Sequence, residues 1–211
     1  MIQKFFNIEV YAKARELIKK EGLRNVLDIG CGVGMKLREL IYPVCKDITR
    51  LDKPNTIEQC KKLHNFGQWY AVNIEYDELE ELSEPLLGKD FDLIISSDII
   101  EHLVNPNRLI YLIKKLSNDN TLILLSTIDR DIARGVNDKG PPPNIGHCRE
   151  WNFSEFRNYI EALKFQIIEH VRCRSMRLSA FSKFKHYIKI KIFQGLGGNG
   201  GIQYMLLKRG I

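Results

Sequence analysis

The chain has 211 residues, of which 44% are hydrophobic and 27% charged, a composition that fits one soluble globular domain and excludes a disordered or fibrous protein. No apolar run approaches the ~20 residues that span a bilayer, and charged residues begin too early at the N-terminus for a secretory signal, so we expect a cytoplasmic protein. Five cysteines without a CxxC pair exclude a zinc ribbon and a disulfide framework, so we expect free thiols.

The net charge of +6 is unevenly distributed along the chain. Nine Lys or Arg and no Asp or Glu lie between Arg172 and Ile211, whereas residues 1–171 carry 23 basic and 26 acidic side chains, a net charge of −3. Such a basic segment can attract phosphate-bearing ligands, nucleic acid or an anionic lipid surface. A solvated face without a partner explains the pattern equally well, so both interpretations stay open.

The predicted elements alternate between helix and strand in the first part of the chain. Apolar side chains at helical spacing predict an amphipathic helix over 8–20, and a short apolar run before the first glycines predicts a buried strand over 25–29. The elements that follow are a helix around 37–41, a strand over 48–52, a helix through 57–63, strands over 69–74 and 91–96, a helix over 109–116 and a strand over 121–126. This alternation is typical of βαβ units and a mainly parallel sheet.

The alternation ends after the fifth strand. Residues 128–151 form a loop longer than a connection needs, and we expect an active-site loop that can act as a lid. Asn152 followed by Glu155 predicts a capped helix start. The last predicted elements are strands over 165–171 and 202–207, separated by a basic insertion at 172–201. We therefore predict a single domain over residues 1–211.

The sharpest chemical signal is a glycine loop at a strand-to-helix junction, with the sequence Asp-Ile-Gly-Cys-Gly-Val-Gly at 28–34. Alternate glycines let the backbone turn tightly and approach a ligand, and the N–H groups of the next helix favour a carboxylate or phosphate. The G-x-G-x-G spacing differs from the G-x-G-x-x-G fingerprint, which disfavours a nicotinamide-dependent oxidoreductase. Asp52, at the end of the second strand, can bind both ribose hydroxyls of an adenosyl group, although a surface acid before Pro54 would give the same pattern.

With these features in place, the chain resembles the class I S-adenosylmethionine-dependent methyltransferases. The matching segments are VLDIGCGVG at 26–34, LDKP at 51–54, FDLIISSDIIEHL at 91–103 and LILLST at 122–127. The resemblance implies an α/β, Rossmann-like, doubly wound sheet of seven strands, mainly parallel with the last strand antiparallel. It also implies S-adenosylmethionine as cofactor, with S-adenosylhomocysteine as product, bound across the carboxyl ends of the first strands.

The resemblance assigns a role to each part of the cofactor site. Asp28 would support the ammonium group of the methionine moiety, Asp52 would hold the ribose, and the glycines would cradle the methionine moiety. The residues after the third strand would flank the adenine, where Asn73 replaces an acid common in the family, and the serines after the fourth strand would line the pocket. The complete predicted set is Asp28, Gly30, Cys31, Gly32, Gly34, Asp52, Lys53, Asn73, Ile74, Ser96 and Ser97.

Two further segments carry candidate catalytic residues. Glu-His-Leu at 101–103 resembles the small-molecule branch of the family, which includes ubiquinone-pathway and sugar O-methyltransferases. STIDRD at 126–131 and GPPPNIGHCREW at 140–151 are similar to loops of methyltransferases found with bacterial surface-polysaccharide biosynthesis. The predicted catalytic residues are His147, His102 and Asp129, and the predicted substrate-binding residues are Arg149 and Trp151.

The roles of these residues follow from their chemistry, and each has a structural alternative. His147 can take a proton from an acceptor hydroxyl, because the ordinary pKa of histidine lies close to neutrality. Arg149 can hold an anionic group through two hydrogen bonds, or can pair with a neighbouring acid. His102 can equally be a structural histidine bonded to the backbone, and Trp151 can cover the core. The spacing of His and Asp residues predicts no metal site.

We therefore predict methyl transfer to a small molecule, to a hydroxyl of a sugar or sugar-containing metabolite. The fourth strand lacks the acid-Pro-Pro-aromatic run of amino-methylating DNA enzymes, and no Pro-Cys nucleophile follows it. RNA or a lipid-linked acceptor stays open, since the basic and aromatic stretch 181–193 suits a phosphate-bearing carrier or a membrane surface. A cofactor-binding partner protein without catalysis is a further alternative.

Overall fold

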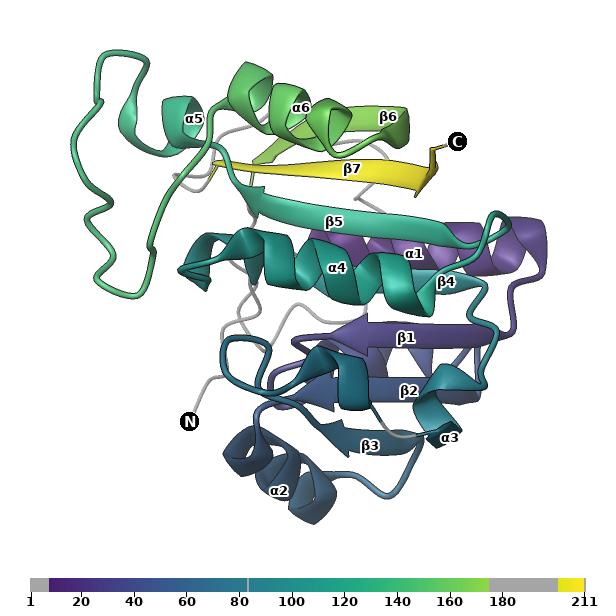
Figure 1. Cartoon of the computed structure of the whole chain (residues 1–211). Coiled ribbons are helices and arrows are strands. Elements are labelled where there is room, and N and C mark those ends of the chain that lie inside the picture. Colours follow the sequence, from purple (N-terminus) through teal and green to yellow (C-terminus); the bar gives the residue numbers. More distant parts are fainter. Residues whose placement is uncertain (1–7, 83, 175–200, 211) are drawn as a thin grey trace, which may run out of the picture.

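The computed structural model describes residues 8–82, 84–174 and 201–210, which form a seven-stranded sheet with helices on both faces (Figure 1). The strands are β1 (Asn25–Ile29), β2 (Asp47–Asp52), β3 (Gln68–Ala71), β4 (Leu93–Ser97), β5 (Leu122–Ile128), β6 (Phe165–Arg174) and β7 (Gly201–Arg209). The α-helices are α1 (Ile8–Glu21), α2 (Pro54–Leu63), α3 (Glu84–Leu87), α4 (Pro106–Leu116), α5 (Arg130–Arg134) and α6 (Phe153–Ala162). Three short helical turns complete the set: η1 (Leu37–Ile41), η2 (Leu79–Glu81) and η3 (Ile100–His102).

The strand order is β3-β2-β1-β4-β5-β7-β6, and the pairs among β1 to β5 are parallel. The last strand, β7, runs antiparallel to both β5 and β6. The predicted fold class is therefore confirmed. The carboxyl ends of the parallel strands share one edge of the sheet, at the left in Figure 1, so the segments that follow β1, β2, β4 and β5 meet there.

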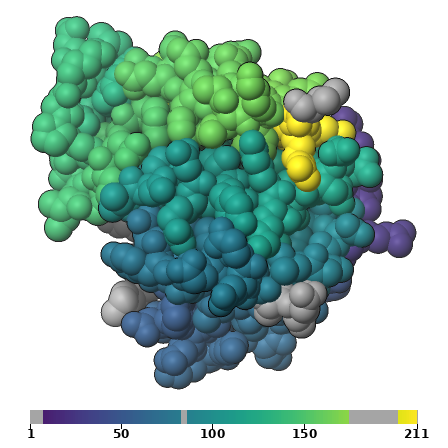
Figure 2. Space-filling model, viewed as in Figure 1, coloured from purple at the N-terminus to yellow at the C-terminus, as the bar shows by residue number. Residues whose placement is uncertain are grey.

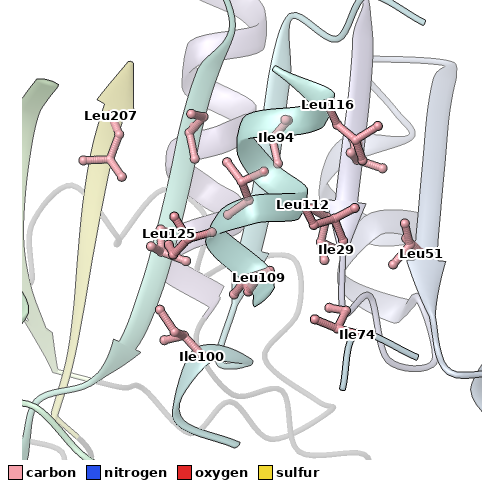
Figure 3. Packing of buried hydrophobic residues seen from close by; sticks show 14 of the residues in the cluster. Ile29, Leu51, Ile74, Ile94, Ile100, Leu109, Leu112, Leu116, Leu125 and Leu207 are labelled. Atoms are coloured by element: carbon pink, nitrogen blue, oxygen red, sulfur yellow. The ribbon is translucent and has the colours of Figure 1, made fainter. Parts of the chain in front are cut away.

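Two apolar clusters hold the helices against the two faces of the sheet. One cluster lies under α4, where Leu109, Leu112 and Leu116 face side chains of the sheet such as Ile94 (Figure 3). The other lies under α1 and contains Val26 of β1, whereas its neighbour on the strand, Leu27, belongs to the first cluster. Alternate side chains of a strand point to opposite faces, so a strand covered by helices on both sides is apolar throughout.

The third strand is shorter than predicted. It ends at Ala71 rather than at Ile74, because Asn73 begins a turn in which its carbonyl oxygen accepts the N–H groups of Tyr76 and Asp77. The side chain of Asp77 also accepts the N–H of Asn73 at 2.7 Å. Local side-chain-to-backbone bonds of this kind compete with strand pairing and release the chain from the sheet edge.

The predicted loop at 128–151 contains a short helix, α5, that the sequence pattern did not predict. Its two ends meet at a bridge between Asp129 and Trp151, so the segment is a closed surface loop, and it projects at the upper left in Figure 2. The predicted helix start after the loop is confirmed: Asn152 accepts the N–H of Glu155 at 2.9 Å and Glu155 accepts the N–H of Asn152 at 2.9 Å.

Some predictions concern parts of the chain that the structure covers only in part. Most of the predicted basic insertion at 172–201 lies outside the described residues, and so does the stretch 181–193. Among the helices that are described, none has the length and apolar character to cross a membrane. All five cysteines are free, as expected, and three of them, Cys31, Cys45 and Cys60, are buried.

Candidate functional site

The glycine loop after β1 has the left-handed backbone that its composition predicts. The φ angles of Gly30, Gly32 and Gly34 are +77°, +54° and +72°. A Cβ at Gly30 would lie 2.2 Å from the side chain of Ile99, so the loop and the segment after β4 are in close contact. A Cβ at Gly32 would meet nothing within 4 Å, and Gly32 is exposed. The loop therefore has open space at Gly32, where a ligand can approach the backbone.

Asp52 at the end of β2 is tied to this loop. Its Oδ2 accepts the N–H of Gly32 at 2.8 Å, and its Oδ1 accepts the N–H of Lys53 at 2.7 Å. Lys53 is exposed and contributes this backbone group, which precedes α2. The two bonds hold the carboxylate beside the open position at Gly32. The structure thus places Asp52, which is predicted to bind the ribose, next to the glycine loop, which is predicted to bind the methionine moiety.

Asp28 lies inside the fold at the end of β1 and is fully buried. Tyr11 of α1, which the sequence analysis missed, donates a hydrogen bond from its hydroxyl to Asp28 Oδ2 at 2.9 Å. Burial raises the pKa of Asp28 to about 7, although the Tyr11 bond and the nearby charge of Lys36 oppose the rise. Among the described residues, Asp28 Oδ1 has no hydrogen-bond partner. Tyr11 could be recognised in the sequence only as an apolar position of the helix, since nothing local links it to Asp28.

Arg50 of β2 is a second buried charge that the sequence did not reveal. Its side chain is fully buried, and its guanidinium carbon lies 3.6 Å from the ring centre of Phe66 and 3.7 Å from that of Trp69. Burial lowers the pKa of Arg50 to about 10, and Asp28 and two cysteines oppose the fall. A cation between two aromatic faces is attracted by both rings. Arg50 therefore adds positive charge beneath the glycine loop.

The two serines that end β4 and the residues after β3 lie at the same edge of the sheet. Ser97 accepts a hydrogen bond from Ser126 at 3.1 Å and donates one to Asp98 at 3.1 Å, whereas the Ser96 hydroxyl is buried and has no partner among the described residues. Ile74 is buried in the core, and Asn73 uses its side-chain oxygen to accept the N–H of Glu75. Asn73 thus shapes its own turn.

A compact polar cluster forms where η3 meets the long loop. Glu101 is buried and accepts a hydrogen bond from Thr127 at 3.1 Å. Burial, together with the nearby charge of Asp98, raises the pKa of Glu101 to about 8. His102 is exposed, and its Nδ1 lies 2.7 Å from the carbonyl oxygen of Gly146. This carbonyl contact is the structural role that the sequence left open for His102.

His147 is brought to this cluster by bonds between the loop and η3. The carbonyl oxygen of Glu101 accepts the N–H groups of Cys148 at 2.7 Å and Arg149 at 3.3 Å. The ring centres of His147 and His102 consequently lie 4.7 Å apart, with the rings nearly perpendicular. Since Ile99 of the same segment covers Gly30, the two histidines belong to the edge of the sheet that carries the glycine loop.

Comparison with known proteins assigns the family. The family described as a methyltransferase domain matches residues 6–170 of this chain. The chain belongs to this methyltransferase family. Over 118 residues this methyltransferase is 30% identical to the mitochondrial ubiquinone biosynthesis O-methyltransferase of Dictyostelium discoideum, a match that covers 52% of this chain and 36% of that protein. Over 108 residues it is 27% identical to the ubiquinone biosynthesis O-methyltransferase of Bordetella avium (strain 197N), covering 51% of this chain and 44% of that protein.

Solved structures show the same fold. The plantazolicin methyltransferase BpumL in complex with SAH aligns with a TM-score of 0.61 at 19% identity, covering 96% of this chain and 82% of that one. The N-methyltransferase NodS from Bradyrhizobium japonicum WM9, in complex with S-adenosyl-L-homocysteine, aligns with a TM-score of 0.58 at 16% identity, covering 94% of this chain and 85% of that one. The predicted class I methyltransferase fold is confirmed, and both of these neighbours are complexes with S-adenosylhomocysteine, the product that the predicted cofactor would give.

The residues of this methyltransferase fit that cofactor. Asp28 Oδ1 is a buried carboxylate oxygen without a partner among the described residues, which suits the ammonium group of the methionine moiety. Gly32 leaves open space beside Asp52, whose carboxylate suits two ribose hydroxyls. Cys31, which also belongs to the predicted cofactor-binding set, is buried. Its thiol lies 3.4 Å from the carbonyl oxygen of Gly32, so it contacts the backbone of the glycine loop.

Three other predicted residues of the long loop make contacts within the fold. Asp129 is fully buried; its Oδ1 accepts the N–H of Asp131 as the cap of α5, and its Oδ2 accepts Arg172 Nε at 2.7 Å. Both oxygens are therefore engaged and Asp129 caps α5, while its catalytic role stays a prediction. Trp151 packs against Phe156 in the core. Arg149 is exposed and donates to the carbonyl oxygen of Val104 at 2.8 Å.

The fold also gathers potential metal-ligating groups from two distant segments of the chain. Glu101, His102 and His147 each offer one ligand atom, and these atoms lie within 4.8 Å of one another. However, both ring nitrogens of His147 already have partners, Glu150 and Asn144. We therefore keep metal-independent activity as a prediction, and the chelator control described in the Discussion tests it.

The two buried carboxyls make stability depend on pH. Asp28 and Glu101 have folded pKa values of about 7 and about 8, above the ordinary values of 3.8 and 4.5. A raised pKa favours the protonated folded form, so this stability is complete below about pH 4 and is lost as the pH rises through 7 and 8. We expect the free energy of unfolding to fall by about 2 to 4 kcal/mol for each carboxyl between pH 4 and pH 9.

Urea unfolding of the protein at a series of pH values measures this fall. Asp28→Asn and Glu101→Gln each remove one titrating group and should each flatten the curve. If both variants retained the pH dependence of the wild type, neither carboxyl would carry it.

Proposed function

We propose that this protein transfers the methyl group of S-adenosylmethionine to a hydroxyl of a small molecule, a sugar or sugar-containing metabolite. The observation that carries the proposal is the position of His147, next to His102 and at the same edge of the sheet as the glycine loop. A histidine in that place can receive the proton of an acceptor hydroxyl. Asp28 would hold the methionine end of the cofactor, and Asp52 would hold the ribose.

The bound cofactor supplies a methyl group on a sulfonium, which is an electrophile with a neutral leaving group. The main task of the protein is therefore to align an acceptor oxygen with the methyl carbon. Asp52 and the glycine loop would hold the cofactor. The long loop, which follows β5, would carry His147 to the methyl acceptor. His147 takes the hydroxyl proton as the carbon–oxygen bond forms.

The relatives suggest other acceptors. The ubiquinone biosynthesis O-methyltransferases match over less than half of their own length, and their name makes a hydroxyl group in ubiquinone biosynthesis a second candidate acceptor. NodS is an N-methyltransferase, so an amine acceptor is a third. Arg149, exposed on the loop, would suit an anionic group on any of them. An RNA or lipid-linked acceptor, and a non-catalytic partner protein, remain the alternatives raised by the sequence.

Calorimetric titration of S-adenosylhomocysteine into the wild type and Asp52→Ala tests the cofactor site. The variant loses charge-assisted hydrogen bonds to the ribose, so we expect affinity to fall by about 10- to 100-fold. Asp47→Ala is the matched control, because Asp47 is an exposed acid at the opposite end of β2. It should bind as the wild type does.

Failure of the wild type to bind S-adenosylhomocysteine would contradict the proposal. If binding is found, assays with sugar hydroxyls, phenols and amines identify the acceptor class. Methylation of an amine alone would overturn the choice of a hydroxyl.

A further inference from the structure

His147 belongs to a hydrogen-bonded chain made by the long loop. Its Nδ1 lies 2.7 Å from Oε1 of Glu150, whose side chain is only 2% exposed. The other oxygen, Oε2, accepts Nη1 of Arg134 at 3.0 Å. Arg134 in turn pairs with Asp138 and donates to the carbonyl oxygen of Gly140 at 2.7 Å. Both oxygens of the Glu150 carboxylate are thereby held in place.

The neighbours of His147 define which ring nitrogen carries the proton. The side-chain oxygen of Asn144 accepts the N–H of Gly146 at 3.0 Å, so its amide nitrogen faces His147, 2.9 Å from Nε2. An amide nitrogen can only donate, so Nε2 must accept. A carboxylate at Nδ1 accepts in the same way, so Nδ1 must carry the hydrogen. Two independent contacts therefore give the same tautomer, with the lone pair on Nε2.

We propose that Glu150 is a positioning residue that holds His147 with Nδ1 protonated and Nε2 free to accept a proton from the methyl acceptor. The proposal rests on the proposed function, and it deepens the description of that site. Asn144 occupies the place that the acceptor hydroxyl would take, since both present a hydrogen to Nε2. The acceptor group that fits is therefore a neutral donor such as a hydroxyl.

The ionisable groups around His147 support this arrangement. On η3, Glu101 and His102 face the ring, and in the loop Glu150 faces it with Arg134 behind. When His147 takes a proton, Glu150 lies beside the new imidazolium as its counter-ion. A buried carboxylate stabilises such a charge far more than an exposed one does.

Glu150→Gln should reverse the tautomer. Arg134 only donates hydrogen bonds, so the amide oxygen of the new Gln must turn toward it, and the amide nitrogen then faces Nδ1. This arrangement places the ring hydrogen of His147 on Nε2, so Nε2 can no longer accept a proton from the methyl acceptor. Glu150→Asp keeps the carboxylate and should restore part of the wild-type behaviour.

The first test is ¹⁵N NMR of the His147 ring in the full protein, which reads the tautomer without any methyl transfer. We expect Nδ1–H in the wild type and Nε2–H in Glu150→Gln. Glu155→Gln is the matched control, because Glu155 pairs with Arg130 at 2.8 Å and caps α6. An unchanged tautomer in Glu150→Gln would overturn the positioning role, whatever reaction the protein performs.

The second test is kinetic. Glu150→Gln should lower kcat by about 100-fold with KM little changed. A full wild-type rate with a reversed tautomer would refute His147 as the base and with it this part of the proposed function. A wild-type rate and tautomer together would refute the role of Glu150.

Discussion

His147→Ala is expected to lower kcat by about 10² to 10⁴-fold and to leave the affinity for S-adenosylhomocysteine unchanged. The variant removes the nitrogen that accepts the hydroxyl proton, while the glycine loop and Asp52 keep their contacts with each other. Initial rates with an acceptor identified as above, and calorimetry with S-adenosylhomocysteine, measure the two quantities. Unchanged turnover would exclude His147 as the base.

His102→Asn is the matched control for this variant. His102 uses Nδ1 to contact the carbonyl oxygen of Gly146, and the amide of Asn can donate to the same oxygen. We therefore expect its kcat to fall by less than about 10-fold, as for a residue that orders the loop. A second control is dialysis against EDTA, which should leave the rate unchanged. Loss of activity with recovery on adding a divalent cation would instead assign Glu101, His102 and His147 to a metal site.

Gly67→Ala is expected to lower the free energy of unfolding by about 3 kcal/mol or more. Gly67 precedes β3 with φ of +72°, and a Cβ there would lie 2.5 Å from the carbonyl oxygen of Ile48 and 3.2 Å from the Arg50 guanidinium. The backbone of β2 cannot move aside without breaking its pairing with β1 and β3. Urea denaturation measures the loss.

Gly22→Ala separates the two causes of that loss. Gly22, which follows α1, has a similar φ of +68°, but a Cβ there would meet nothing within 4 Å. Its substitution carries the cost of the left-handed backbone alone, about 1 to 2 kcal/mol. Equal losses at Gly22 and Gly67 would mean that the contact with β2 has no effect.

The alternation of helices and strands was predictable from the sequence, because each element depends mainly on its own residues. A strand buried on both faces is mostly apolar, as Val26, Leu27 and Ile29 of β1 are, and a capped helix start needs only Asn152 and Glu155. The glycine loop was predictable for the same reason, since its three positive φ angles are local requirements. The predicted third strand was too long because the turn hydrogen bonds of Asn73 compete with strand pairing.

The sequence by itself thus determined the order of the elements and the glycine loop, which follow from short-range patterns, and the fold class, which its resemblance to the methyltransferases implied. The tertiary structure alone decided which polar groups meet. The loop bonds to η3 bring His147 to His102, 45 residues earlier in the chain, and helix packing brings Tyr11 to Asp28. Asp129 is another case: its contact with Asp131 as the cap of α5 is local, but its burial and its ion pair with Arg172 come from the fold. Contacts between distant segments depend on how the sheet orders its strands, and that order leaves no local pattern in the sequence.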